Sequence, residues 1–436
     1  MKKIFTSWTR YTKVYPNYYE VNNLSELRRI VKTQKKILIV GNCRSYGDVC
    51  LNKVFMVSMK NFNRIIFFDK KKGIIEVESG LLLKDLLPEI LLYKWFPPVT
   101  PGTKYVTVGG MVSNNIHGKN RRNNFFSDHI LSITLMNSDG NILICTKKKN
   151  KELFQATVGG LGLTGVIISI IFKLKKIKNT NLERKNIYFQ TLDDIHDIDD
   201  INKDYNYNVT WINSFSKKNK ISGIHFFAKH DNSPNKLVII YKPKEKKINF
   251  IHKILFKIFD NCYLYRFVNF FFIFYHKFFL GKMVNIEDFF YPQDKYLNWN
   301  LLYPKKKFLE FHIFIEKNNL LNFLNDFFDF CEKNSFYSTL IVLKKFNIKD
   351  HINDYFHNFD GYSLSLDFNN NSFKLKNFFL IKSYKYKYFF NFAKDLFGTK
   401  KSFFKRQKFN EFASRINKIN KYKKFSSILS DRYQIT

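Results

Sequence analysis

Three glycine-rich segments near the beginning of the chain constrain its fold more than any other feature. They read "GNCRSYGD" (residues 41–48), "PGTKYVTVGGMVSNNIHGKN" (101–120) and "ATVGGLGLTGV" (156–166). Glycine permits positive φ and close backbone approach, so loops of this kind can hold an anion with backbone N–H groups. The amides Asn114 and Asn115 and the imidazole of His117 have little use in an apolar core. The segments predict loops around a large polar ligand.

Strands and helices are expected to alternate around these loops. We predict strands over residues 36–40 and 73–80, a helix over 81–93 and a hairpin over 129–143 that turns at Asp139 and Gly140. The stretch from Thr107 begins like the turn of a buried strand. Further along, the pattern predicts strands over 308–317, 338–346 and 362–368, a helix over 319–334 and helices with basic faces in the tail. The part of the chain up to Lys178 is therefore predicted to form an α+β or α/β domain.

The third segment contains Gly160, Gly162 and Gly165 in the G-x-G-x-x-G spacing of dinucleotide-binding folds. That fingerprint needs a strand before it and a helix after it, so that the pyrophosphate meets a helix N-terminus. Here the predicted order is helix, glycines, strand. The order argues against a Rossmann site.

The formal net charge of +37 would ordinarily indicate nucleic acid or an anionic membrane as a partner. The lysines are scattered, however, and Lys, Asn, Ile, Phe and Tyr are used heavily throughout, as in a genome biased towards A·T codons. No nucleic-acid recognition motif accompanies them, so we expect no nucleic-acid partner. The five cysteines form no CxxC pattern, which indicates a reducing compartment and neither a disulfide framework nor a metal site.

Two apolar runs raise the question of a membrane. Residues 153–172 carry no charge over a membrane-spanning length, but four glycines and a β-branched second half favour a buried strand. Residues 267–281 are too short and are interrupted by Asn269, His276 and Lys277. We expect the aromatic stretch 267–279 to touch a membrane surface or a lipid chain. The N-terminal segment shows no apolar core of a signal peptide.

Taken together and in this order, the three glycine segments resemble the FAD-binding PCMH-type domain of the vanillyl-alcohol-oxidase superfamily. Within it the chain is similar to the decaprenylphosphoryl-ribose oxidases, the flavin subunits of a two-component 2'-epimerase. "FFYPQD" (289–294) and "AKD" (393–395) support the likeness, which is clearest up to Lys175. The resemblance implies an α+β fold with an FAD-binding domain at 1–178, a substrate domain on an antiparallel sheet at 179–387, and a helical segment at 388–436 that returns to the flavin.

The resemblance also implies that backbone amides from several loops hold the FAD pyrophosphate, with His117 beside the flavin ring. Some relatives attach FAD through a His of the first loop. This loop has none, so we expect non-covalent FAD, with Cys43 as an alternative tether. The expected cofactor residues are Gly41, Asn42, Cys43, Arg44, Ser45, Tyr46, Gly47, Pro101, Gly102, Thr103, Thr107, Gly109, Gly110, Asn114, His117, Gly118, Gly159, Gly160, Gly165 and Ile167.

On the reacting side, oxidation of an alcohol by a flavin needs a proton acceptor and positive charge near the reduced ring. The family pattern maps that charge to Lys394. Where mycobacterial members carry other residues, this chain has Glu310, His312, Ser363, Ser365 and Asn391. The expected catalytic residues are Lys394, Tyr303, His117 and His312, and the expected substrate-binding residues are Tyr46, Lys344, Ser365 and Glu310.

The function implied is oxidation of the 2'-hydroxyl of a polyprenylphosphoryl-ribose to the keto sugar, for cell-envelope polysaccharide synthesis. A separate NAD(P)H-dependent reductase would complete the epimerisation. The protein would be cytoplasmic and peripherally bound to the inner membrane. Two alternatives stay open: a soluble sugar-alcohol or aldonolactone oxidase of the same fold, and a basic membrane-peripheral binding protein without turnover.

Overall fold

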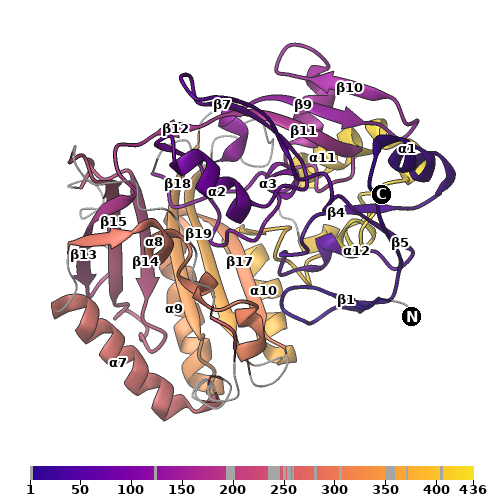
Figure 1. Ribbon diagram of the computed structural model, residues 1–436. Helices are drawn as coiled ribbons and strands as arrows, with labels where there is room; N and C mark the ends of the chain where they lie inside the picture. The colour runs from indigo at the N-terminus through magenta and orange to yellow at the C-terminus, as the bar shows by residue number, and fades with distance from the viewer. Residues whose placement is uncertain are drawn as a thin grey trace.

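The computed structural model describes residues 3–121, 125–192, 202–233, 246–248, 252, 257, 260–278, 282–303, 307–348, 359–369, 372–402 and 406–436. In these residues helices combine with mostly antiparallel sheets, so the fold is of the mixed α+β type that the sequence predicted. Figure 1 shows the two larger sheets beside each other, with the C-terminal helices next to the N-terminal strands.

The N-terminal part of the chain, up to β11, builds a five-stranded antiparallel sheet and a small parallel one. The larger sheet has the order β10-β9-β11-β7-β6, and the smaller has the order β3-β5-β4. Helix α2 (Leu83–Leu91) buries its leucines in the same core as Ile75 and Val77 of β7. The strands are β3 (Asn17–Glu20), β4 (Leu38–Val40), β5 (Phe55–Ser58), β6 (Ile65–Asp69), β7 (Ile74–Glu78), β9 (Ile130–Met136), β10 (Ile142–Cys145) and β11 (Val166–Lys173).

Most of the predicted elements here are confirmed. β9 and β10 form the expected hairpin, which turns at Gly140 with φ +82°. The residues between 153 and 172 form the end of α4 (Lys151–Thr157), the glycine loop and β11. That order excludes the Rossmann arrangement, as predicted. Among the described residues, no helix is both long and apolar enough to cross a membrane.

The prediction for the stretch from Thr107 was wrong. It is not a strand turn but the short helix α3 (Val108–Ser113), in spite of its two glycines. Thr107 caps the helix, since its Oγ1 accepts a hydrogen bond of 3.2 Å from the backbone N–H of Gly110. Such a cap stabilises a helix by about 1 kcal/mol, which offsets the low helix propensity of one glycine.

The second large sheet has eight strands in the order β16-β13-β15-β14-β18-β19-β17-β20. Helices α9 (Lys317–Asn334) and α10 (Phe373–Tyr386) lie against it, and α7 (Cys262–Phe278) lies beside its β13–β14 end (Figure 1). The strands are β13 (Asn181–Phe189), β14 (Tyr207–Ile212), β15 (Gly223–His230), β16 (Met283–Asn285), β17 (Leu309–Glu316), β18 (Leu340–Ile348), β19 (Phe359–Phe368) and β20 (Phe389–Phe390).

The two faces of this sheet differ in chemistry because side chains alternate along each strand. In β17, Phe311, Ile313 and Ile315 pack in one core with apolar residues of α9 and α10. Glu310 and His312 occupy the intervening positions and face the other way. The register pairs His312 with Ser365 of β19 and Lys344 of β18 with Ser363. One face of the sheet therefore carries polar groups from three adjacent strands.

The tail of the chain packs against its beginning. Helix α11 (Arg406–Ile419) contacts α4, and α12 (Ile428–Arg432) contacts the one-turn helix at Asp48–Cys50. Phe425 forms a parallel bridge with Ile37, directly before β4. This return brings residues near 394 to the first glycine loop.

Candidate functional site

A single cavity of about 740 Å³ brings together the three glycine segments and the polar face of the eight-stranded sheet. This volume lies within the range of small-molecule and cofactor sites. The expected cofactor residues that line it are Gly41, Asn42, Cys43, Arg44, Ser45, Tyr46, Pro101, Gly102, Thr103, Thr107, Gly109, Gly110, Asn114, Gly165 and Ile167. Four of the expected catalytic and substrate-binding residues also line it, namely Lys394, Lys344, Ser365 and Glu310.

Several glycines leave open space at the cavity wall. A Cβ on Gly102 would meet no atom within 4 Å, and one on Gly162 would meet only the Ile39 carbonyl oxygen, at 4.0 Å. A Cβ on Gly110 would meet only Thr107 Oγ1, at 3.1 Å. The buried Asn114 Oδ1 has no hydrogen-bond partner among the described residues. A cradle with open glycines and an unpaired amide oxygen fits a large polar cofactor such as FAD.

Other glycines allow the loops themselves to meet. A Cβ on Gly41 would lie 2.2 Å from Thr107 Oγ1, and one on Gly109 would lie 2.8 Å from the Ser79 Cβ. No side chain fits at these distances, so glycine is needed where the first loop approaches α3 and where α3 approaches the end of β7. The result is a narrow wall of backbone on one side of the cavity.

The first glycine loop presents backbone donors. The backbone N–H groups of Asn42, Cys43 and Ser45 donate to no acceptor among the described residues. Cys43 has φ +47°, a left-handed conformation that turns successive N–H groups towards one concavity. Arg44 stacks over Trp8, with its guanidinium carbon 4.1 Å from the ring centroid. These groups can bind a diphosphate.

Beside the first glycine loop, the half-buried Lys394 forms an ion pair with the buried Glu310. Lys394 Nζ lies 2.6 Å from Glu310 Oε1 and 4.6 Å from the ring centroid of Tyr46. Burial acts to raise the pKa of Glu310, but the Lys394 ammonium outweighs it and holds that pKa below its ordinary value. Burial and the negative Glu310 raise the pKa of Asp367 in β19, which also lines the cavity. The wall therefore combines a carboxyl group whose pKa is lowered with a second carboxyl group whose pKa is raised.

His312 lies behind this wall and does not line the cavity itself. Its Nδ1 is 2.9 Å from Ser365 Oγ and its Nε2 is 2.6 Å from Ser363 Oγ. Burial, together with the nearby Lys394 charge, lowers the pKa of His312 to about 4. The imidazole is therefore neutral at neutral pH, and it reaches the cavity through the hydroxyl of Ser365, which lines it.

Two lysines with shifted pKa values line the same cavity. Burial lowers the pKa of Lys344 to about 8, with a further contribution from the Lys394 charge. Burial, and then the charge of Lys344, lowers the pKa of Lys119 to about 7. Lys119 Nζ donates to the Phe289 carbonyl oxygen. Both lysines are placed where an anionic substrate would gain from them.

Seven of the expected site residues do not line this cavity. Tyr303 stacks on Phe308 at 4.3 Å between centroids, and His117 packs against His312 at 5.3 Å. At Gly160 the chain packs closely against its own backbone, since a Cβ there would lie 2.0 Å from the Ala156 carbonyl oxygen. The seven are Gly47, His117, Gly118, Gly159, Gly160, Tyr303 and His312.

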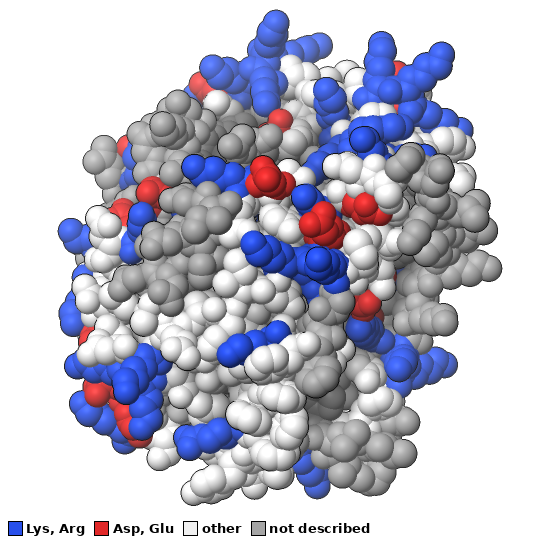
Figure 2. Space-filling view, turned by 90° about the vertical axis from the view of Figure 1, so that its left-hand side faces the viewer, with Lys and Arg blue, Asp and Glu red and all other residues white. Residues whose placement is uncertain are grey.

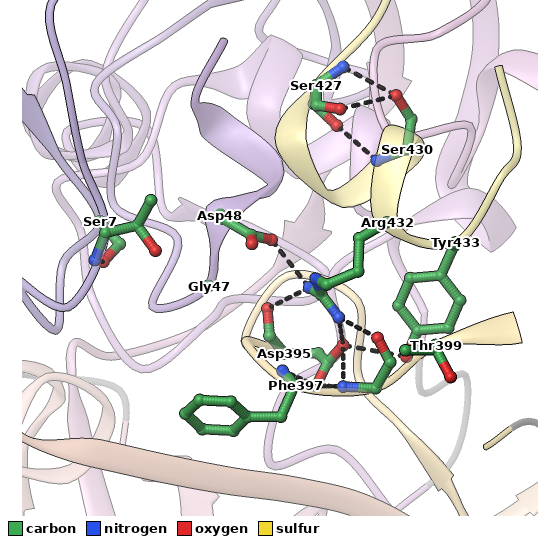
Figure 3. Close-up of polar contacts among 12 residues, drawn as sticks. Ser7, Gly47, Asp48, Asp395, Phe397, Thr399, Ser427, Ser430, Arg432 and Tyr433 are labelled. Atoms are coloured by element: carbon green, nitrogen blue, oxygen red, sulfur yellow. Dashed lines mark hydrogen bonds and ion pairs between the residues drawn. The ribbon is translucent and has the colours of Figure 1, made fainter. Parts of the chain in front are cut away.

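Gly47 lies instead where the first glycine loop contacts the residues on either side of Lys394. Its N–H donates to the Ala393 carbonyl oxygen at 3.2 Å, and a Cβ there would lie 2.2 Å from the Asp395 carbonyl oxygen. Figure 3 shows Arg432 of α12 reaching both Asp395 and Asp48, at 2.7 Å and 2.8 Å. The residues on either side of Lys394 are thus tied to the first glycine loop.

The sequence reasoning did not identify Asp367, Lys119, Arg432 or Asp48. For Asp367 a signal existed, because "YSLSLDF" places Ser363, Ser365 and Asp367 on one face of a strand at a spacing of two. For Arg432 and Asp48 there was none, since they are 384 positions apart in the sequence.

Comparison with known proteins agrees with the geometry. Residues 18–146 match the family model of an FAD binding domain. This span includes the first glycine loop and α3 together with its cap. The region therefore binds FAD, and its loops form the backbone side of the cavity.

Several curated relatives are named as oxidases. The chain is 30% identical to L-gulonolactone oxidase of Mus musculus over 38% of this chain and 39% of the relative. It is 31% identical to decaprenylphosphoryl-beta-D-ribose oxidase of Mycolicibacterium smegmatis over 46% of each. With D-arabinono-1,4-lactone oxidase of Kluyveromyces lactis the identity is 26%, over 43% of this chain and 38% of the relative. The matches thus span less than half the length of these relatives.

Proposed function

We propose that this chain, which binds FAD through the domain matched at residues 18–146, is a PCMH-type flavin oxidase that oxidises a hydroxyl group of a sugar. The observation that carries the proposal is the shared cavity. It joins the backbone loops of the FAD-binding domain to Lys394, Glu310 and Ser365 on the polar face of a second sheet. We assign residues 1–178 to the flavin domain, 179–387 to the substrate domain and 388–436 to the returning segment.

Bound FAD supplies the acceptor for the hydride, and the residues of this chain supply charge and proton transfer. Lys394 provides positive charge on the cavity wall, and its partner Glu310 fixes the position of the ammonium. The substrate hydroxyl gives its proton to Ser365 Oγ as Ser365 gives its own to the neutral Nδ1 of His312. In this step the Nε2–H of His312 would donate to Ser363 Oγ, which lies 2.6 Å away.

For the substrate we propose the 2'-hydroxyl of a polyprenylphosphoryl-ribose, which becomes the keto sugar, with a separate NAD(P)H-dependent reductase completing an epimerisation. Lys344 and Lys119 support this choice, because two lysines in one buried cavity suit a phosphate diester better than an uncharged lactone. The M. smegmatis relative is named for such a substrate.

A lactone or sugar-alcohol oxidase is the second candidate, favoured by the relatives named for gulonolactone and arabinonolactone. A binding protein without turnover is a third. The ion pair of Glu310 with Lys394 favours it, since a neutralised lysine gives less stabilisation to a reduced flavin.

Anaerobic reduction of the flavin separates the three candidates. The purified yellow protein is mixed with farnesylphosphoryl ribose, with gulonolactone or with xylitol, and the visible flavin absorbance is followed. We expect bleaching by the phosphorylated ribose and none by the other two. Bleaching by the lactone or by xylitol, and not by the phosphorylated ribose, would select the second candidate, and a coloured protein that no donor bleaches would select the third.

A further inference from the structure

Helix α7 carries a row of phenylalanines that faces solvent. The row repeats every three or four residues, so it follows one side of the helix. Phe267 is 63% exposed, Phe270 60% and Phe278 61%. Neighbouring rings of the row touch each other: the centroids of Phe267 and Phe271 are 4.5 Å apart, and those of Phe274 and Phe278 are 5.1 Å apart. An exposed apolar row of this size marks an interaction surface.

The charges on α7 are all positive. The helix contains Arg266 and Lys277 and no Asp or Glu. Lys277 Nζ lies 5.2 Å from the Phe278 ring centroid, at the edge of the row. Figure 2 turns the side that carries α7 towards the viewer and shows, in its lower half, a broad uncharged area with isolated blue groups. Aromatic residues flanked by basic side chains are the composition that binds the headgroup region of an anionic bilayer.

The opposite side of α7 lines the flavin cavity. Tyr265, Asn269, Phe272 and His276 repeat at spacings of four, three and four residues and all line it. The Phe272 ring lies 4.7 Å from Trp211 of β14. Asn269 is buried, and its Oδ1 has no partner among the described residues. The cavity therefore continues from the glycine loops to a largely aromatic chamber beneath α7.

We propose that α7 lies in the interface of an anionic bilayer, with its phenylalanine row (Phe267, Phe270, Phe271, Phe274 and Phe278) among the lipids. Its inner side covers the part of the cavity that takes the isoprenoid chain of the substrate. The lipid identity of the substrate rests on the proposed function, whereas the docking of α7 rests on the exposed row and the basic side chains beside it. A chain drawn from the bilayer would pass beneath α7 without crossing water.

Vesicle flotation tests the docking. The holoprotein is floated with phosphatidylcholine vesicles containing phosphatidylglycerol, and the fraction bound is compared for wild type, the double variant Phe270→Ser/Phe274→Ser and the control Phe67→Ser. Phe67 is 56% exposed on β6, in the five-stranded sheet. We expect the double variant to bind about tenfold or more weakly, since each phenylalanine loses part of its buried apolar area. The control should bind as wild type does.

Equal flotation of wild type and the double variant would overturn the docking. So would a wild-type dimer in light scattering that the double variant lacks, together with no binding to vesicles, because a second copy would then be the partner of the row. FAD content and reduction by a soluble short-chain donor, measured on the same samples, show separately whether the oxidase assignment stands.

Tryptophan fluorescence tests whether a lipid chain enters the chamber beneath α7. Trp211 is one of four tryptophans and touches the inner side of α7. Farnesyl phosphate should change tryptophan emission in a saturable way, inorganic phosphate should not, and Trp211→Phe should remove most of the change. If inorganic phosphate gives the same response, or if Trp211→Phe leaves the response intact, no lipid chain enters beneath α7.

Discussion

At the scale of single residues, the ion pair between Lys394 and Glu310 has two roles that mutation can separate. Lys394→Met should slow flavin reduction by about 100-fold, as the loss of one charged stabilising group does in other enzymes. It should also cost about 3 kcal/mol in the free energy of unfolding, because Glu310 is 4% exposed and would be left unpaired. Stopped-flow absorbance and urea unfolding measure the two effects.

The double variant Lys394→Met/Glu310→Gln is the matched control for that experiment. It removes both charges, so most of the stability should return while reduction stays slow. Full reduction by either variant would take Lys394 out of the mechanism.

Because the pKa of Lys344 is shifted, we expect the binding of a phosphorylated donor to depend on pH. In the folded protein its pKa is lowered to about 8, so its ammonium is present below that pH and is lost as the pH rises through it. Affinity for a phosphorylated donor should therefore fall above pH 8, with a limiting slope of about tenfold per pH unit. Lys344→Arg should remove this contribution because arginine keeps its charge, which leaves only the fall in affinity that Lys119 causes as the pH rises through its pKa of about 7. An unshifted profile in wild type would exclude Lys344 from phosphate binding.

Which residues reach the cavity could be predicted only in part. The first glycine loop is a local pattern and indicated Gly41, whereas Gly110 and Glu310 were expected only through the family resemblance; all three line the cavity. The positions of Tyr303 and His117 depend on which neighbouring rings they pack against, and no sequence pattern records that choice.

At the scale of elements, α3 shows how two adjacent glycines differ in role. Gly110→Val should leave the fold intact but place an isopropyl group in the cavity, and FAD should bind tenfold to 100-fold more weakly, which corresponds to about 1–3 kcal/mol of overpacking. Gly109→Ala should instead destabilise the protein by a similar amount, because its Cβ would lie 2.8 Å from the Ser79 Cβ. FAD titration of apoprotein and thermal unfolding distinguish the two.

If Gly110→Val bound FAD as tightly as wild type does, α3 would not face the cofactor. The same helix shows the limit of pattern analysis. Strands such as β11 and β17 were predictable because their apolar period is two or their β-branched content is high. In α3, the capping side chain of Thr107 offsets only part of the low helix propensity of two glycines, and no local pattern shows that the helix forms in spite of the rest. In α7, phenylalanines occur on both sides, so its two faces became visible only in the fold.

At the scale of the whole molecule, the end of the chain positions part of the site. Arg432 joins Asp48 of the first loop to Asp395, next to Lys394. Arg432→Met would leave two buried carboxylates without their cation, and the free energy of unfolding should fall by about 3 kcal/mol or more. Slower flavin reduction should accompany this, since Lys394 loses its anchor.

The triple variant Arg432→Met/Asp48→Asn/Asp395→Asn should recover part of that stability without recovering the rate. Restoration of the rate together with the stability would show that the ion network holds only the fold. Ion pairs between residues so far apart in the sequence leave no local pattern. The return of the tail to the flavin could therefore be expected only from the family resemblance.

We expect the glycine-rich backbone loops in the N-terminal part of the chain to hold FAD without a covalent bond. This can be checked on the absorption spectrum of the purified protein, taken before and after acid precipitation. The expected result is a flavin spectrum with about one FAD per chain, all of it in the supernatant after acid. A colourless protein that takes up no added FAD would show that the loops do not hold the cofactor, and flavin retained in the precipitate would show that it is attached covalently.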